Sequence, residues 1–217
     1  MTAYLDDRLF TNGMNDQSTV AEFIEAARVS LNGTGRLLIG LRCDACEVQP
    51  EQLDDLLSEP LHRFDRLDLI SDQPSRVVID ILEHAASCLG QSFELVHEAA
   101  EKMTSGACGE AMEVLITCLR TWGQVHEAVV KGGQLLAVDF NELIIEGRPV
   151  QAWLAGLVDR LREIKSVVES NDLVLLADML RYELDETLQE WEGFLRGFIT
   201  RVREIQTSES ARHPVVP

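Results

Sequence analysis

The chain has 217 residues and the composition of a globular protein, with 46% hydrophobic and 26% charged residues. It carries 37 acidic against 19 basic residues, a formal net charge of −18. Such a charge repels phosphates and anionic lipid, so binding to nucleic acid or to a membrane surface is disfavoured. A basic or amphipathic protein partner fits better. The alternative is that the charge serves solubility alone.

Residues 1–18 are polar and rich in turn formers, and we expect them to be mobile. They lack the basic leader and apolar core of an export signal. No stretch approaches the ~20 apolar residues that a membrane span needs. The five cysteines lack framework spacing and indicate free thiols in a reducing compartment. These features predict a cytoplasmic protein.

Residues 19–73 mix helical and strand patterns and predict a small α+β unit. Thr19 and Glu22 form a capping-box pattern that begins a helix. The turn Asp44-Ala45 lies between two aliphatic runs and predicts a β-hairpin, although Ala45 resists the positive φ that a two-residue turn requires. The expected elements are a helix from Val20 towards Asn32, hairpin strands over 36–42 and 46–48, a helix over 50–57 and a strand over 66–70.

From Pro74 onward the apolar residues recur every three to four positions, as in amphipathic helices. Gly132-Gly133 and Gly147-Arg148-Pro149 interrupt this pattern. Short connections between long helices are typical of antiparallel neighbours. We therefore expect an antiparallel bundle of about four or five helices over 74–206, and a disordered tail over 207–217. The expected helices cover 75–103, 107–131, 135–145, 150–168 and 172–206.

The last long segment, Asp172 to Gln206, has the pattern of one continuous amphipathic helix. Its apolar residues form a single stripe, and no proline interrupts it. At ~1.5 Å per residue the helix would extend roughly 50 Å. A stripe of this length also allows a homodimer through this helix. The stripe consists of Leu173, Ala177, Leu180, Leu184, Leu188, Trp191, Leu195, Phe198, Val202 and Ile205.

Two stretches resemble an uncharacterised bacterial family that is known as a domain of unknown function. The run from Asp172 to Leu184, with Trp191 behind it, is similar to the family's D-x-V-x-L-A-D-x-L-x-Y-E-L pattern. The run RLLIGLRCDACEV is similar to the family's strand–Asp-Gly–strand hairpin, with Ala45 in place of the glycine. The resemblance covers about residues 19–205 and implies no established activity. It singles out Asp178, Tyr182 and Glu183.

Cys43 and Cys46 form a C-x-x-C pair, a spacing that allows a disulfide or one edge of a zinc site. A structural zinc site needs four ligands, and no second C-x-x-C or C-x-x-H completes it. A redox dithiol needs its first thiolate at a helix N-terminus, and no helix is predicted to begin at Cys46. We therefore favour two small residues that fill strand positions, with thiol chemistry as the alternative.

Two sets of residues on the predicted bundle helices have the residue types of metal or acid–base sites. Glu94, His97 and Glu101 contain Glu-x-x-His, half of a di-metal motif, but no second Glu-x-x-His exists and this face points to solvent. His126 extends an apolar stripe and suits a base or ligand. A histidine at the edge of the core, hydrogen-bonded to one polar partner, is the simpler interpretation. We expect no metal and no cofactor.

Asp178 and Tyr182 lie four residues apart on the C-terminal helix, next to Glu183. With Trp191 they are the candidates for contact with a basic partner, because tyrosine offers an amphipathic surface. The alternative is an interhelical hydrogen bond that holds the bundle in register.

The sequence therefore predicts a mainly α protein, in which the small N-terminal α+β unit packs on the C-terminal bundle. P-loop, G-x-G-x-x-G, H-E-x-x-H and G-x-S-x-G motifs are absent, which disfavours the enzyme classes that carry them. We expect a non-enzymatic cytoplasmic interaction scaffold, adaptor or secretion-type chaperone. The alternative is a metal- or thiol-dependent helical bundle.

Overall fold

The structure of the protein, a computed structural model, describes residues 1–10 and 17–212, with side chains as far as residue 207. The chain divides into two compact units, Met1–Val77 and Val78–Pro217. Each unit has a hydrophobic core of its own. The predicted class is confirmed, since a small N-terminal sheet region precedes a helical region in a mainly α chain.

The first unit is a mixed five-stranded sheet of order β2-β1-β5-β3-β4. β1 and β5 run parallel at its centre, and the other pairs are antiparallel. Helix α1 packs across one face of the sheet. Its elements are β1 (Thr2–Leu5), β2 (Arg8–Leu9), α1 (Val20–Leu31), β3 (Leu37–Cys43), β4 (Cys46–Glu47), α2 (Pro50–Leu56), the 3-10 turn η1 (Leu61–Arg63) and β5 (Arg66–Asp72).

The N-terminal segment departs from the expected mobility, because β1 and β2 belong to the sheet. Asp6 and Asp7 form the tight turn between them, with positive φ values of 51° and 61°. β1 pairs with β5, which lies more than sixty residues later in the chain. The local sequence of so short a strand gives no signal for such a distant pairing. Residues 11–16 of the expected mobile segment lie outside the described residues.

The predicted β3–β4 hairpin is confirmed, including its unfavourable turn. Asp44 and Ala45 adopt φ values of 50° and 68°, so Ala45 takes the conformation that its side chain disfavours. The Asp44 carboxylate accepts hydrogen bonds of 2.8 Å from the backbone N–H groups of Asp65 and Arg66. These bonds hold the turn against the start of β5 and offset the strain at Ala45.

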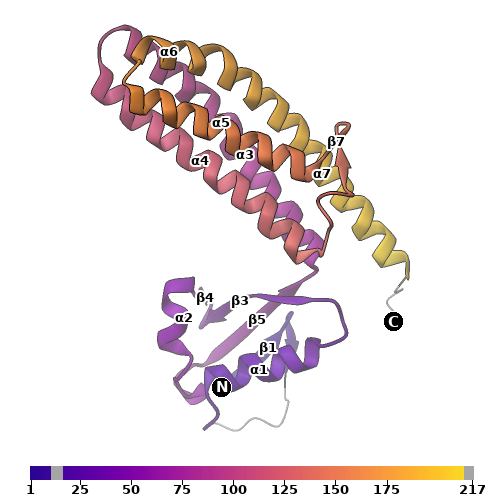
Figure 1. Cartoon of the computed structure of the whole chain (residues 1–217). Coiled ribbons are helices and arrows are strands. Elements are labelled where there is room, and N and C mark those ends of the chain that lie inside the picture. The colour runs from indigo at the N-terminus through magenta and orange to yellow at the C-terminus, as the bar shows by residue number, and fades with distance from the viewer. Residues whose placement is uncertain (11–16, 213–217) are drawn as a thin grey trace. The chain divides into compact units, whose positions relative to one another are not determined.

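The second unit is a bundle of long antiparallel helices (Figure 1). Glu83 pairs with Arg203 and His97 with Asp185, so the first and last helices of the bundle run in opposite directions. The elements are α3 (Pro74–Thr104), α4 (Cys108–Leu135), β6 (Ile144–Ile145), β7 (Arg148–Pro149), α5 (Val150–Ser170), α6 (Leu173–Asp178), the π-helical segment η2 (Met179–Leu184) and α7 (Asp185–Arg212).

The predicted helix over 135–145 is wrong. Gly132 and Gly133 do not break the chain but lie inside α4, and the chain then turns towards the hairpin of β6 and β7. The ring of Phe140 occupies the space beside Gly133, where a Cβ would lie 2.0 Å from its Cε1 atom. The glycine is therefore required for packing, which sequence periodicity does not reveal.

The predicted C-terminal helix is present but is not a uniform α-helix. It consists of α6, η2 and α7, and the π-helical turn falls within the family-like run. Its end also differs from the expectation, because α7 continues to Arg212 where a tail was expected over 207–217. Residues 213–217 lie outside the described residues.

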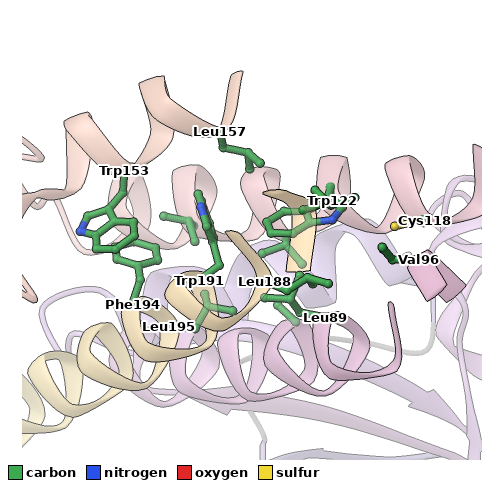
Figure 2. Packing of buried hydrophobic residues seen from close by; sticks show 14 of the residues in the cluster. Leu89, Val96, Cys118, Trp122, Trp153, Leu157, Leu188, Trp191, Phe194 and Leu195 are labelled. Atoms are coloured by element: carbon green, nitrogen blue, oxygen red, sulfur yellow. The ribbon is translucent and has the colours of Figure 1, made fainter. Parts of the chain in front are cut away.

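The core of the bundle centres on a cluster of aromatic rings (Figure 2). Trp191 of α7 packs edge-on against Trp122 of α4 and Trp153 of α5, with centroid distances of 5.7 and 6.5 Å. Phe194 stacks on Trp153 at 5.1 Å. The indole Nε1 of Trp153 donates a 3.0 Å hydrogen bond to the backbone oxygen of Ile145. These contacts tie three helices and the β6 strand to one another.

Candidate functional site

The π-helical segment is explained by the spacing of its buried residues. Leu176, Leu180, Leu184 and Leu188 lie four residues apart, and none is more than 2% exposed. On an α-helix, residues four apart drift by about 40° around the axis. A π-helical turn contains more residues, so four residues come closer to one full turn and the drift decreases. Locally, η2 keeps Leu180 and Leu184 directed into the core.

The same geometry aligns residues on the outside of the helix. Val174, Asp178, Tyr182 and Glu186 also lie four apart, and all four are exposed. Val174 is 75% and Tyr182 65% exposed, so both side chains are open to a partner. We call these four residues the outer face of η2.

The three candidate residues of the family-like run, Asp178, Tyr182 and Glu183, differ in their polar contacts. Glu183 pairs with Arg160 of α5, which also pairs with Glu163 at 2.9 Å. Within the described part of the chain, Asp178 and Tyr182 form no hydrogen bond or ion pair. Glu183 therefore makes the interhelical contact that was one of the two alternatives, whereas Asp178 and Tyr182 stay on the surface.

Two further predicted residues have different surroundings. Trp191 is 2% exposed and lies in the aromatic core, so it cannot contact a partner at the surface. His126 lines an open groove of about 470 Å³ between α4 and α5. Among the described residues it has no hydrogen-bond partner, unlike the bonded core-edge histidine that was favoured.

His97 lies beside the end of η2. Its Nε2 is 3.3 Å from Oδ1 of Asp185, and its ring lies 4.8 Å from that of Phe93. Glu94 and Glu101 are exposed on α3. Within the ranges that the structure describes, no three His, Cys, Asp or Glu side chains are placed to hold a metal ion. The sequence missed Asp185 because nothing in one sequence pairs it with a residue 88 positions earlier.

Cys43 and Cys46 face each other across the β3–β4 hairpin as register partners, and both are free thiols. Burial raises the pKa of the Cys43 thiol to about 11, and the charges of Asp44 and Cys46 act in the same direction. Because the thiolate is the reactive species, this environment suppresses thiol chemistry near neutral pH.

The second unit is thus an antiparallel helical bundle with a π-helical turn whose outer face is free. The chain belongs to the family described as Domain of unknown function (DUF8042), which matches over residues 80–194. This match includes all of η2. It does not reach the first unit, so the β3–β4 hairpin lies outside the matched residues. No curated protein and no solved structure matches the chain. In the described ranges, no helix has the length and apolarity to cross a membrane.

Proposed function

We propose that the chain is a non-enzymatic cytoplasmic scaffold, of the adaptor or secretion-chaperone type, which binds a basic amphipathic helix on the outer face of η2. One observation carries the proposal: Tyr182 and Val174 are exposed in line with carboxylates that have no cationic partner. Neither Asp178 nor Glu186 forms an ion pair within the described residues.

Burial of the apolar part of this face supplies the attraction. Val174 and Tyr182 lose water contact when a partner covers them, and the hydrophobic gain is proportional to the area covered. Leu175, which is 46% exposed, extends the apolar surface on α6. A helix with apolar residues at spacings of three and four can lie along such a face.

Charge selects the kind of helix. Asp178 and Glu186 flank Tyr182 along the face, and the whole chain has a formal net charge of −18. A lysine- or arginine-rich helix would be attracted at long range and would pair with these carboxylates at contact. An acidic helix of the same apolar pattern would be repelled. The alternative function, thiol chemistry at Cys43, has less support because burial raises the pKa of that thiol to about 11.

The test uses two synthetic amphipathic helices that share one leucine face and carry either lysine or glutamate on the other. We expect the full chain to bind the lysine peptide, and Tyr182→Ala to weaken that binding about tenfold. Asp178→Asn with Glu186→Gln should reduce its salt dependence. Ile116→Ala is the matched control, since Ile116 is also exposed but lies on α4. Equal binding of both peptides, or no effect of Tyr182→Ala, would refute the proposal.

The same variants distinguish a second copy of the chain from a different partner. If the outer face of η2 formed a homodimer, sedimentation would give a dimer that Tyr182→Ala dissociates, and dimer formation would compete with the peptide. A monomeric chain that binds the lysine peptide supports a heterologous partner.

A further inference from the structure

A second surface, independent of η2, carries chemistry that the proposed function does not use. It is a groove of about 470 Å³ between α3 and α4, on the bundle. Most of its exposed lining surface is apolar. The lining residues are Ile81, Ala85, Val125 and Ala128, with Asp80, His84, Cys88 and Gln124 at the polar positions.

His84 and Cys88 lie side by side in this groove. They lie one helical turn apart on α3, and the distance from His84 Nε2 to Cys88 Sγ is 3.6 Å. Cys88 is half-buried in the groove and His84 is exposed at its edge. A histidine in this position can take the thiol proton and leave a thiolate that faces apolar side chains.

The other cysteines lack this combination. Burial raises the pKa of Cys118 to about 11 against the opposing effect of Trp122, and that side chain is fully buried. Cys43 also has a pKa raised to about 11 by burial. Cys46 is exposed on the hairpin. Cys108 is the first residue of α4, but it lines neither of the two grooves described above.

We propose that the α3–α4 groove is a covalent site for apolar α,β-unsaturated carbonyl compounds, with Cys88 as nucleophile and His84 as base. His84 takes the proton of the Cys88 thiol, and the thiolate forms a C–S bond with the β-carbon of the ligand. The electron pair of the C=C π bond moves to the carbonyl oxygen as an enolate. The enolate then takes the proton from the imidazolium and returns to the carbonyl form, so the addition needs no oxidant and releases no leaving group.

The groove supplies selectivity by covering the apolar tail of the ligand. Ile81, Ala85 and Val125 form a surface beside Cys88 on which an alkyl chain can lie. Each buried methylene contributes about 0.8 kcal/mol, or roughly a fourfold gain in binding. A longer alkyl chain should therefore accelerate modification of Cys88 and of no thiol outside the groove.

The experiment treats the full chain with trans-2-pentenal or trans-2-nonenal and maps adducts by peptide mass spectrometry after borohydride reduction. We expect Cys88 to react first and faster with nonenal, while Cys46 and Cys108 show no preference between the two aldehydes. His84→Gln should slow the reaction at Cys88 by about 10²-fold. Because His84 is exposed, this variant should keep the circular dichroism spectrum and melting temperature of the wild type.

A second variant tests the groove separately from the base. Ile81→Asn should remove the chain-length preference at Cys88, so that nonenal no longer reacts faster than pentenal. First modification at Cys46 or Cys108, or equal rates for the two aldehydes at Cys88, would overturn the proposed site. An unchanged rate in His84→Gln would overturn the role of His84.

Discussion

His97 Nε2 on α3 lies 3.3 Å from Asp185 Oδ1, at the junction between η2 and α7. Within the described residues the buried Oδ1 atom accepts no hydrogen bond, so the two atoms lie close together without a hydrogen bond between them. Oδ2 of Asp185 accepts a weak hydrogen bond from Gln189 at 3.4 Å. The ring of Phe93 lies tilted by 58° against that of His97, with the ring centroids 4.8 Å apart. The π-helical turn thus ends at a carboxylate that lies against His97 of α3.

Asp185→Ala should loosen η2 more than it destabilises the bundle. It removes the contact to His97 at the end of the π-helical turn, which lets residues 179–184 exchange their amide hydrogens faster. We expect a loss of about 1 kcal/mol in the free energy of unfolding, the size of one partly exposed polar contact. Hydrogen–deuterium exchange measures the first effect and urea unfolding the second.

Asp159→Ala is the control, since Asp159 pairs with Arg162 on one exposed face of α5. It should change neither quantity measurably. If both variants left the exchange of 179–184 unchanged, His97 and Asp185 would have no part in fixing η2.

Trp191→Ala and Tyr182→Ala should have opposite consequences although both residues lie in the C-terminal helix. Trp191 fills the centre of the aromatic core, and its truncation should cost about 3–5 kcal/mol. Tyr182 is exposed, so Tyr182→Ala should change stability by less than about 0.5 kcal/mol. Urea unfolding followed by far-ultraviolet circular dichroism compares the two. A large loss in Tyr182→Ala would mean that its binding defect reflects unfolding.

The sequence predicted most elements because their signals are local. The capping box at Thr19, the stripe on α3 and the spacing of the last helix all lie within a few turns of chain. It missed β1, which pairs with the long strand β5 more than sixty residues later in the chain. It also predicted a helix end at Gly133. In one sequence, a glycine that leaves room for the ring of another residue looks the same as a glycine that ends a helix.

The candidate site was predictable in part for the same reason. The resemblance of residues 172–184 to the family pattern singled out Asp178 and Tyr182, and their exposure follows from helical spacing. Leucines at every fourth position are consistent with the π-helical turn, but the same spacing also fits an α-helix with a broad apolar stripe. The groove at Cys88 was missed because three of its eight lining residues come from α4.

Gly133→Ala should destabilise the bundle by about 1–3 kcal/mol. Its new Cβ would overlap the ring of Phe140, which must then leave its place beside α4. Gly123→Ala is the control on the same helix, because no atom lies within 4 Å of its added Cβ. That substitution should stabilise the bundle by about 0.5–1 kcal/mol, through the better helix propensity of alanine.

A double substitution isolates the overlap. Phe140→Ala removes the ring, so adding Gly133→Ala to it should cost much less than adding it to the wild type. Thermal unfolding of the four proteins gives the coupling energy. Additive effects of the two substitutions would show that Phe140 is not the reason for the glycine.

Asp6 should make the first unit less stable in acid. Its Oδ1 accepts a 2.7 Å hydrogen bond from the Ser71 backbone N–H, and its Oδ2 accepts from the Ser71 hydroxyl at 2.6 Å and from Arg36 at 3.1 Å. Burial alone would raise the pKa of Asp6, but the Ser71 hydrogen bonds and the Arg36 charge outweigh it and lower the pKa below 3.8. The stabilisation by Asp6 is therefore fully present above the unfolded pKa and is lost as the pH falls through the folded value.

Asp6→Asn should lower the free energy of unfolding by about 1–2 kcal/mol near neutral pH, since it removes charge-assisted hydrogen bonds. It should also reduce the loss of stability as the pH falls. Asparagine tolerates the positive φ of this position, so the turn itself is preserved. Asp7→Asn, at the other positive-φ residue of the turn, is the control and should lose stability in acid as the wild type does. Urea titrations followed through the NMR signals of β5 at about pH 7 and about pH 3 measure both variants, because the three tryptophans report only on the bundle. Equal acid sensitivity of wild type and Asp6→Asn would contradict the assignment of this pH dependence to Asp6.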